Sequence, residues 1–431
     1  MKTLHTQQEK EKALLVIVLL AQEAYAGWSS QDCKNELREL ARSANKVEVM
    51  DEIVVSLEKP RPDLFIGKGK AEEIHTLIHL HNEEIDTVIF NENLSSTQQR
   101  NLEEALGVKV IDRTQLILDI FARRAHSIDG KLQVELAQLE YLKPRLTGKG
   151  VMLSRLGGGI GTSGPGEQKL EVDRRRISKR ISKIREELKI TKQRRLQRRY
   201  TRKEHYLTTV ALVGYTNAGK STLLKALTNE SVYIDDMLFS TLDTTSHQLI
   251  LPNNQKILLI DTVGFLHNLP HGLIEAFKAT LEEVIQADLL IHVADISNPS
   301  LNQLMDSVYK VLKELDAENK PMIVALNKID KAGDNLDAKK LCKKFNDCIA
   351  ISAIKKEGLS QLIDMIMKKF SGLLADIDML IPYHNMNLLN MIYNEGNVLE
   401  RKDTPEGIRI KAQLPMQVKE KILTKKPSVV K

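Results

Sequence analysis

The sequence predicts a multidomain α/β protein, and three observations support this. The chain has 431 residues, about three times the ~150 residues of a typical domain. Strand-like apolar runs alternate with helix-period segments through residues 1–150, which favours βαβ units on a parallel sheet. Strands and helices alternate again after a glycine-rich segment and a basic segment, so a second α/β unit is expected there.

The N-terminal unit has strand-like runs separated by helix-period segments. The predicted strands are Leu14–Leu20, Glu52–Leu57, Thr87–Phe90 and Val108–Ile111. The predicted helices are Asp32–Ser43, Ala71–His81, Thr97–Leu106 and Gln115–Arg124. Ser95 and Ser96 precede one of these helices, and a serine hydroxyl there can accept from the free N–H groups of the first turn. We therefore expect a serine N-cap at this position.

The first apolar run, Ala13 to Ala21, admits two interpretations. Lys10 and Lys12 precede it, and Ala24-Tyr25-Ala26 resembles a signal-peptide cleavage site. Glu9 and Glu11 dilute that positive flank, which favours a buried first strand. The run is nine residues long, whereas a membrane span needs about twenty, so an integral membrane protein is excluded. Peripheral membrane contact stays open.

The composition narrows the class of protein further. Apolar residues make up 42% and charged residues 28%, as in ordinary soluble proteins. Aromatic residues are only 4%, which disfavours a binder that stacks on single-stranded bases. Cys33, Cys342 and Cys348 cannot form a disulfide framework, and no Cys/His cluster suggests zinc. A reducing, cytoplasmic location fits best.

A glycine-rich segment, Leu153 to Gln168, interrupts the alternation. Its small residues offer almost nothing to bury, so we expect a loop. A flexible linker is the simpler interpretation, but glycines concentrated beside a basic segment favour a functional loop. The glycines are Gly157, Gly158, Gly159, Gly161, Gly164 and Gly166.

The next segment carries the basic character of the chain. Lys169 to Lys203 holds sixteen Lys/Arg and four Asp/Glu, a local charge of +12, while the whole chain is +6. The remainder is therefore −6. Isoleucines at 177, 181 and 184 and Leu188 mark one helical face, but Ile190 and Leu196 do not continue it, so we expect a helical hairpin rather than one rod. A solvated charged face is the plain alternative to a nucleic-acid contact.

A phosphate-binding loop opens the second α/β unit. GYTNAGKS matches GxxxxGK[ST] between a strand-like run and a helix-forming segment. Backbone N–H groups would wrap the β-phosphate, Lys220 would reach the β- and γ-phosphates, and the Ser221 hydroxyl would ligate Mg²⁺. Alone, the motif leaves the base open. The predicted nucleotide-binding residues here are Gly214, Tyr215, Thr216, Asn217, Ala218, Gly219, Lys220 and Ser221.

Further motifs follow in order, each after a strand. Asp261-Thr262-Val263-Gly264 offers a carboxylate that can hold Mg²⁺ through water and a Gly264 N–H for the γ-phosphate. A carboxylate at Asp330 can accept from both N1–H and the 2-amino group of guanine, which selects GTP over ATP. Backbone of Ser352-Ala353-Ile354 can contact the guanine O6. The predicted residues are Asp261, Thr262, Val263, Gly264, Asn327, Lys328, Ile329, Asp330, Ser352, Ala353 and Ile354.

A switch loop lies between the first two motifs. Thr241 is the expected second Mg²⁺ hydroxyl, within the predicted GTP-binding residues Phe239, Ser240, Thr241, Leu242 and Asp243. We expect Lys220, Thr241 and Gly264 to act in hydrolysis. Phe265 follows Gly264 where Ras-type proteins place a water-orienting glutamine, so intrinsic hydrolysis should be slow and a partner should complete the site. These motifs together predict a GTPase.

With these motifs in hand, the chain resembles the HflX family of the Obg–HflX group of GTPases. The resemblance is specific and runs from Arg61 to about Leu414. It is carried by GGGIGTSGPGE at Gly157–Glu167, the following LE and DRR, the switch sequence FSTLD, DTVGF, and Ile381-Pro382-Tyr383 before Glu395-Gly396.

The resemblance implies four parts. They are an N-terminal parallel-sheet α/β domain with its glycine loop (1–168), a basic helical hairpin (169–205), a P-loop GTPase domain (206–372) and a small C-terminal α/β domain with a basic tail (373–431). The position of Asn217 is similar to that of an asparagine that seats K⁺ in potassium-dependent GTPases, with a simple turn residue as the alternative.

The resemblance also implies a function. Family members bind the large ribosomal subunit and split stalled or idle ribosomes, notably under heat stress. The hairpin and loop are the parts expected to reach the rRNA, and the predicted RNA contacts are Gly157, Gly158, Gly159, Arg174, Arg175 and Arg176. Two alternatives are a ribosome-assembly or RNA-modification GTPase and a nucleotide-regulated RNA-binding or unwinding protein.

Overall fold

A computed structural model describes residues 10–21, 27–45, 47–80, 84–146, 165–204, 208–228, 239, 245–267, 281–332 and 338–424. The N-terminal unit is built on a parallel sheet with strand order β2-β1-β3-β4. Its strands are β1 (Glu11–Leu20), β2 (Val47–Leu57), β3 (Thr87–Phe90) and β4 (Lys109–Ile111). Residues 13–18 of β1 are fully buried, which confirms the expected strand.

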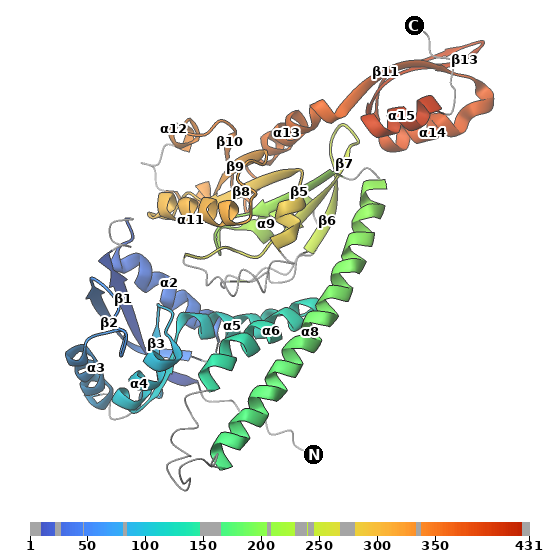
Figure 1. Cartoon of the computed structure of the whole chain (residues 1–431). Coiled ribbons are helices and arrows are strands. Elements are labelled where there is room, and N and C mark those ends of the chain that lie inside the picture. Colours follow the sequence, from blue (N-terminus) through green and yellow to red (C-terminus); the bar gives the residue numbers. More distant parts are fainter. Residues whose placement is uncertain are drawn as a thin grey trace, which may run out of the picture.

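Helices cover both faces of this sheet (Figure 1). Leu15 and Ile17 pack with α2 (Ser30–Ser43) and α5 (Arg113–Arg124), and Leu14 and Val16 pack with α3 (Lys68–Leu80) and α4 (Ser96–Leu106). The alternation of buried side chains along β1 therefore supplies two cores. The predicted serine N-cap is confirmed at Ser95, whose hydroxyl accepts from the Gln98 backbone while the Gln98 side chain accepts from the Ser95 backbone.

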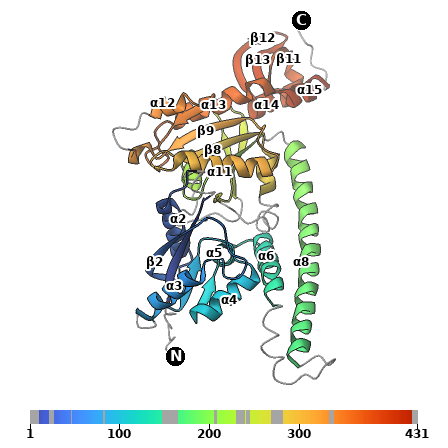
Figure 2. The ribbon, with the colours of Figure 1, turned by 60° about the vertical axis from the view of Figure 1, so that its left-hand side comes forward.

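Two helices follow the sheet, and here the sequence prediction was wrong. The segment expected to be a hairpin is one continuous helix, α8 (Pro165–Glu204). In Figure 2, α8 lies beside α6 (Ile128–Arg145), a helix that the sequence analysis did not predict. No glycine or proline lies between residues 170 and 203, so nothing ends the helix. Helix α8 also begins inside the predicted glycine loop, with Pro165 in the first turn, where proline is well tolerated.

Helices α6 and α8 pack along one short stripe. Leu136, Ile181 and Ile184 are buried together, with Ile177 and Leu188 at the edge. Two ion pairs flank this stripe: Arg180 to Glu135 at 2.6 Å and Arg185 to Glu140 at 2.7 Å. The predicted isoleucine face within residues 169–205 therefore packs against a helix from earlier in the chain, and not against a second arm of a hairpin.

The second α/β unit contains a six-stranded sheet of order β10-β9-β8-β5-β7-β6, in which only β6 is antiparallel. Its strands are β5 (Thr208–Val213), β6 (Thr245–Ile250), β7 (Lys256–Asp261), β8 (Leu289–Asp295), β9 (Met322–Asn327) and β10 (Cys348–Ala350). Its helices are α9 (Lys220–Thr228), α11 (Leu301–Glu314), α12 (Ala338–Cys342) and α13 (Leu359–Phe370). A disulfide that the sequence analysis did not anticipate joins Cys342 to Cys348, whereas Cys33 is free and buried.

The C-terminal unit is a small antiparallel sheet with two helices. Its strands, in the order β11-β13-β12, are β11 (Leu374–Ile381), β12 (Asn397–Thr404) and β13 (Gly407–Pro415). Helices α14 (Met386–Glu395) and α15 (Met416–Thr424) pack on it through a separate apolar core. In Figure 1 this unit lies at the far end of the molecule from the N-terminal sheet.

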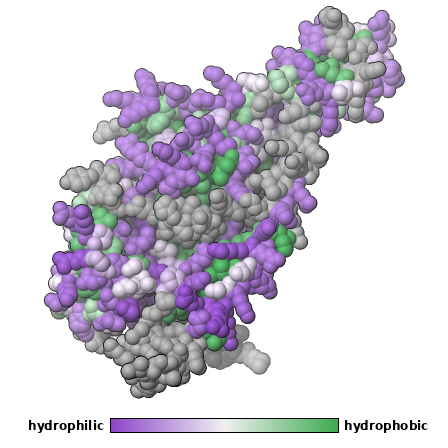
Figure 3. Space-filling model, viewed as in Figure 1, coloured by the Kyte–Doolittle hydropathy of each residue, from purple (hydrophilic) through white to green (hydrophobic). Residues whose placement is uncertain are grey.

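The N-terminal and nucleotide-binding units share a core. One cluster of buried side chains contains Leu37 and Phe121 together with Val213 and Phe265. The two units therefore pack directly on each other, and α8 runs alongside them (Figures 1 and 2). The face in Figure 3 is largely hydrophilic. Within the described part of the chain, no helix is both long enough and apolar enough to cross a membrane.

Candidate functional site

The phosphate-binding motif lies in the turn between β5 and α9. Gly214 leaves β5 with φ of +154°, and a Cβ there would lie 2.2 Å from the Val293 carbonyl oxygen. A Cβ on Gly219, whose φ is +96°, would lie 2.3 Å from the Asn327 amide nitrogen. Both positions need glycine because the loop passes directly over neighbouring strands. The helix N-terminus at Lys220 then points its free N–H groups into the loop.

Lys220 lies inside this loop. Its Nζ donates to the carbonyl oxygens of Gly214 at 3.2 Å and Tyr215 at 2.9 Å. Burial lowers the pKa of Lys220 to about 8, and the nearby Asp261 carboxylate opposes that shift. The ammonium therefore remains mostly charged at neutral pH, in the position where the motif requires a cation for phosphate.

The two residues predicted to serve Mg²⁺ meet at the bottom of the loop. The Ser221 hydroxyl donates to the Asp261 carboxylate at 2.6 Å, and Asp261 is the fully buried last residue of β7. A hydroxyl and a carboxylate are the oxygen donors that Mg²⁺ prefers. This pair fits the ion, while Thr241, the other predicted ligand, lies outside the described residues.

Residues 264–267 lie against the phosphate-binding loop. Phe265 forms a parallel bridge with Tyr215, with Thr216 N–H donating to the Phe265 carbonyl at 2.9 Å and Phe265 N–H to the Gly214 carbonyl at 3.0 Å. A Cβ on Gly264 would lie 2.7 Å from the Thr216 methyl and 3.1 Å from Lys220 Nζ. Gly264 therefore occupies the position expected for a sensor of the terminal phosphate.

The side chains of Thr262 and Val263 face inward instead. The Thr262 hydroxyl donates to the Leu212 carbonyl at 2.6 Å, and Val263 is buried in the core. Only the backbone of these two predicted residues can serve a nucleotide.

Of the predicted switch-loop residues, Phe239 is buried, with the centre of its ring 4.5 Å from that of Phe121 in an edge-on arrangement. Ser240, Thr241, Leu242 and Asp243 lie outside the described residues.

The predicted guanine-binding residues converge at the ends of β9 and β10. The buried Asn327 amide donates to the Ala218 carbonyl at 2.9 Å and accepts from the Ala353 N–H at 3.0 Å. Ser352 donates to Asp330 at 2.6 Å, and this hydrogen bond lowers the pKa of the carboxyl. Asp330 is therefore ionised and held in place, as recognition of a donor pair requires. Ile329 begins the short helix 329–331, and the Ile354 side chain is exposed; the hydrogen-bonding groups of both residues are those of the backbone.

Several residues around this site escaped the sequence analysis. Asp295, the last residue of β8, pairs at 2.7 Å with the predicted residue Lys328, which has a left-handed conformation; only its position at a strand end could have signalled Asp295. His292 on β8 is buried, its Nδ1 makes no hydrogen bond to the residues described, and burial lowers its pKa to about 4. A cavity of about 220 Å³ beside it lies between α2, the phosphate-binding loop and α11.

A polar network also joins the N-terminal unit to the phosphate-binding loop. The Tyr215 hydroxyl donates to Glu36, and Glu36 pairs with Arg113 at 3.1 Å. Arg113 also donates to the His267 carbonyl at 2.7 Å, while the His267 N–H donates to the Tyr215 oxygen at 2.9 Å. The Trp28 ring stacks on the His267 ring, with the two ring centres 4.1 Å apart. The residues are far apart in the chain, so no local pattern predicted them.

The predicted RNA contacts on α8 are exposed. Arg175 and Arg176 side chains are 73% and 78% exposed, and their ion pairs with Glu171 and Asp173 lie within the helix itself. Arg174 is exposed as well. This end of α8 therefore has three neighbouring guanidinium groups at the surface. The other predicted contacts, Gly157, Gly158 and Gly159, lie outside the described residues.

Comparisons with known proteins agree with these motifs. Family models match residues 31–122 (GTP-binding GTPase N-terminal), 124–202 (GTP-binding GTPase Middle Region), 209–328 (50S ribosome-binding GTPase) and 337–425 (HflX C-terminal domain). The GTPase HflX of Caldanaerobacter subterraneus is 45% identical over 420 residues, 96% of this chain and 94% of that protein.

Two further similarities span most of the chain. The GTPase HflX of Escherichia coli is 38% identical over 411 residues, 95% of this chain and 94% of that protein. A crystal structure of a GTP-binding protein from Sulfolobus solfataricus in complex with GDP is 28% identical, covers 84% of this chain and 99% of that chain, and has a TM-score of 0.43.

Proposed function

Since the chain belongs to the HflX family of GTPases and is a GTP-hydrolysing enzyme, we propose that it binds the large ribosomal subunit and splits stalled or idle ribosomes. Heat or other stress is the proposed setting. The observation that carries this proposal is α8, a single 40-residue helix that packs on α6 and has a net charge of +12 between Lys169 and Lys203. Phosphate-rich rRNA is the natural partner of such a surface.

The proposed chemistry follows from the loop geometry. Lys220 and the N–H groups of residues 216–221 would hold the β- and γ-phosphates, and Gly264 would donate its N–H to the terminal phosphate. The P-loop GTPase fold implies a nucleotide-bound Mg²⁺, which neutralises charge on the phosphates when present. In this chain Ser221 would ligate it directly and Asp261 through water, since their oxygens already lie 2.6 Å apart.

The base would be read at Asp330. Its carboxylate accepts from Ser352 and keeps further lone pairs for the N1–H and 2-amino group of guanine. Asn327 links this position to the phosphate-binding loop through the Ala218 carbonyl, so base and phosphate binding share one rigid frame. These residue roles are part of the proposal.

The site offers no described side chain that orients water at the position after Gly264. The phenyl ring of Phe265 has no group that could hydrogen-bond to a water molecule. The side chain is also fully buried, and the backbone of this residue is bridged to Tyr215. Intrinsic hydrolysis should therefore be slow, and the proposed role of the ribosome is to complete the site and stimulate hydrolysis. Asn217, exposed in the loop with φ of +59°, is the proposed K⁺ contact.

Nucleotide turnover with and without purified large subunits tests the proposal. We expect turnover by the full chain to rise with added subunits and to saturate, whereas Lys220→Ala should show no stimulated turnover. Small subunits provide the matched control, because they offer rRNA without the proposed docking surface. Equal stimulation by small and large subunits would contradict specific binding to the large subunit.

A further inference from the structure

Asp112 and Arg113 are consecutive residues at the start of α5, and their side chains leave in different directions. Asp112 caps α5, accepting from the Gln115 N–H at 2.8 Å, and faces the C-terminal end of α6. Arg113 faces the nucleotide-binding unit. Both side chains are almost completely buried. Two neighbouring residues therefore connect the N-terminal sheet to two different parts of the molecule.

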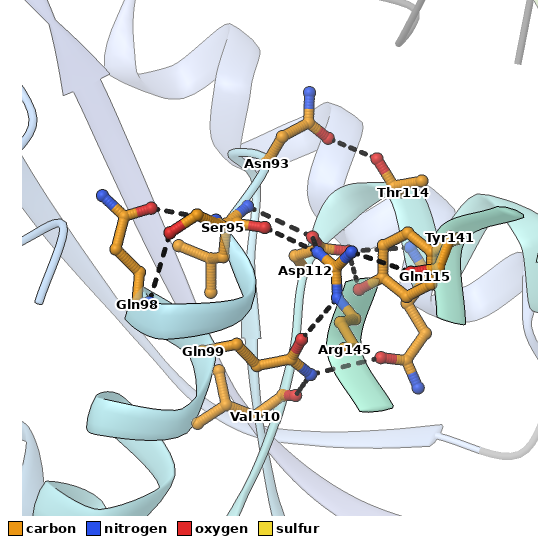
Figure 4. Close-up of polar contacts among 11 residues, drawn as sticks. Asn93, Ser95, Gln98, Gln99, Val110, Asp112, Thr114, Gln115, Tyr141 and Arg145 are labelled. Atoms are coloured by element: carbon orange, nitrogen blue, oxygen red, sulfur yellow. Dashed lines mark hydrogen bonds and ion pairs between the residues drawn. The ribbon is translucent and has the colours of Figure 1, made fainter. Parts of the chain in front are cut away.

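On one side, Asp112 holds the end of α6 (Figure 4). Its carboxylate accepts from the Tyr141 hydroxyl at 2.9 Å and from Arg145 at 3.1 Å. The Arg145 guanidinium lies 3.5 Å from the centre of the Tyr141 ring and also donates to the Leu94 carbonyl at 2.6 Å. Arg145 is the last residue of α6, so this cluster fixes where that helix ends.

Helix α6 in turn carries the basic helix. Leu136 packs against Ile181 and Ile184, and the Arg180–Glu135 and Arg185–Glu140 pairs flank that contact. Any shift of α6 therefore moves α8 with it, because interdigitated apolar side chains do not slide freely.

On the other side, Arg113 binds the segment that follows Gly264. Its guanidinium donates to the His267 carbonyl at 2.7 Å and pairs with Glu36, which also accepts from Tyr215 of the phosphate-binding loop. This segment must respond to nucleotide. A Cβ built on Gly264 would lie 2.7 Å from the Thr216 methyl and 3.1 Å from Lys220 Nζ, so Gly264 is already close to both residues. A terminal phosphate held by Lys220 and the Gly264 N–H would therefore push the segment away from the loop.

We propose that Asp112 and Arg113 are positioning residues that couple the nucleotide state of residues 264–267 to the orientation of the α6–α8 helix pair. A terminal phosphate displaces residues 264–267, Arg113 follows the His267 carbonyl, and the start of α5 passes the displacement through Asp112 to Arg145. The inference rests on the proposed function, in which α8 contacts the ribosome. Through this route GTP would control the orientation of α8.

The direct test is a distance measured without ribosomes. Spin labels are attached through Lys189→Cys on α8 and Lys313→Cys on α11, both exposed, in a Cys342→Ser, Cys348→Ser background that retains the buried Cys33. Double electron–electron resonance spectroscopy then gives the distribution of distances between the two spin labels with GDP and with a non-hydrolysable GTP analogue. The full chain should show different distributions in the two states.

Arg113→Gln should abolish that difference. Arg38→Gln is the matched control, because Arg38 also forms a two-pronged pair with a glutamate, Glu52 of β2, at 2.8 and 2.9 Å, and among the described residues that pair stays within the N-terminal unit. Tyr141→Phe removes only one hydrogen bond to Asp112 and should reduce the difference. If Arg113→Gln does not fold, as judged by thermal unfolding, the Tyr141→Phe measurement alone decides.

The same variants also separate this inference from the proposed function. Coupling between sites typically changes affinity by roughly 5–150-fold, so the full chain should prefer the large subunit with the GTP analogue by a factor in that range. Arg113→Gln should bring the preference close to one. No ribosome binding by the unmodified chain would contradict the proposed function alone, leaving the distance test intact. A wild-type nucleotide response in Arg113→Gln, or no response in the unmodified chain, would overturn the inference.

Discussion

The Ser221 hydroxyl donates to the Asp261 carboxylate at 2.6 Å, although 40 positions separate the two residues in the chain. Ser221 belongs to the first turn of α9 and Asp261 ends β7, which pairs with β5 directly in front of the phosphate-binding loop. The parallel pairing of β5 and β7 thus brings the two proposed Mg²⁺ partners together. The sheet therefore preassembles the proposed metal site.

Base selectivity should depend on Asp330. In Asp330→Asn an amide N–H₂ faces the N1–H of guanine, and an unpaired buried donor costs about 1–3 kcal/mol. Affinity for GTP should therefore fall by roughly 10-fold or more, measured by equilibrium titration with a fluorescent analogue. Xanthosine triphosphate carries a carbonyl in place of the 2-amino group and should bind this variant better than GTP does. Unchanged GTP affinity would show that the guanine site is misassigned.

His292 should make the protein sensitive to acid. Its pKa is lowered to about 4 in the folded chain, below the ordinary 6.5, so the unfolded state binds more protons between these values. The free energy of unfolding should fall as pH drops from about 6.5 towards 4, by up to about 3 kcal/mol. His292→Phe keeps an aromatic ring against Tyr309 and should lose this dependence. Urea unfolding at pH 7.0 and 5.0 measures it, and an equal drop in both proteins would assign the effect elsewhere.

Asn217 should make turnover depend on potassium. In buffers matched for ionic strength, turnover with large subunits present should be higher in KCl than in NaCl. Asn217→Ala should remove the difference while Gly214 and Lys220 still hold the phosphates. Equal turnover of the unmodified chain in both salts would leave Asn217 as a turn residue, consistent with its positive φ.

The basic helix should give ribosome binding a steep salt dependence. If six to ten cations of the Lys169–Lys203 segment neutralise rRNA phosphates, affinity should fall by about 10³–10⁵ between 50 and 200 mM salt. Replacing Arg174, Arg175 and Arg176 together by glutamine should flatten the logarithmic slope by roughly two to three units. The ion pairs of Arg175 and Arg176 are exposed, so the free energy of unfolding should change by less than about 1 kcal/mol. A filter-binding salt titration that gives the same slope for both proteins would place the contact outside this helix.

Much of the fold could be predicted from local patterns. The apolar runs predicted β1, β3 and β5 closely, because a parallel strand that is buried on both faces needs a nearly continuous run of apolar residues. Helix α6 was missed, since Gly130 and Pro144 interrupt its pattern. The hairpin prediction failed because the break in the apolar stripe at Ile190 and Leu196 was interpreted as a chain reversal, whereas the stripe with Ile181 and Ile184 packs on Leu136 of α6 and the helix continues past it.

The candidate site was predictable where a motif carries its own geometry. Lys220, Asp261 and Asp330 follow strands whose carboxyl ends meet at one edge of the sheet. The network of Glu36, Tyr215 and Arg113 was beyond sequence reasoning, because Glu36 and Tyr215 are 179 positions apart and each is unremarkable in its own segment. Such contacts depend on how two complete units pack.

Light scattering by purified 70S ribosomes is the most direct test of whether the GTP-bound chain splits ribosomes. Excess full-length protein with a non-hydrolysable GTP analogue should lower the scattering to the level of separated subunits, and a sucrose gradient of the same sample should show two subunit peaks. Lys220→Ala, which removes the ammonium that would hold the β- and γ-phosphates, should leave scattering unchanged. Ribosomes that stay intact in the presence of saturating, nucleotide-loaded and ribosome-bound protein would contradict the account.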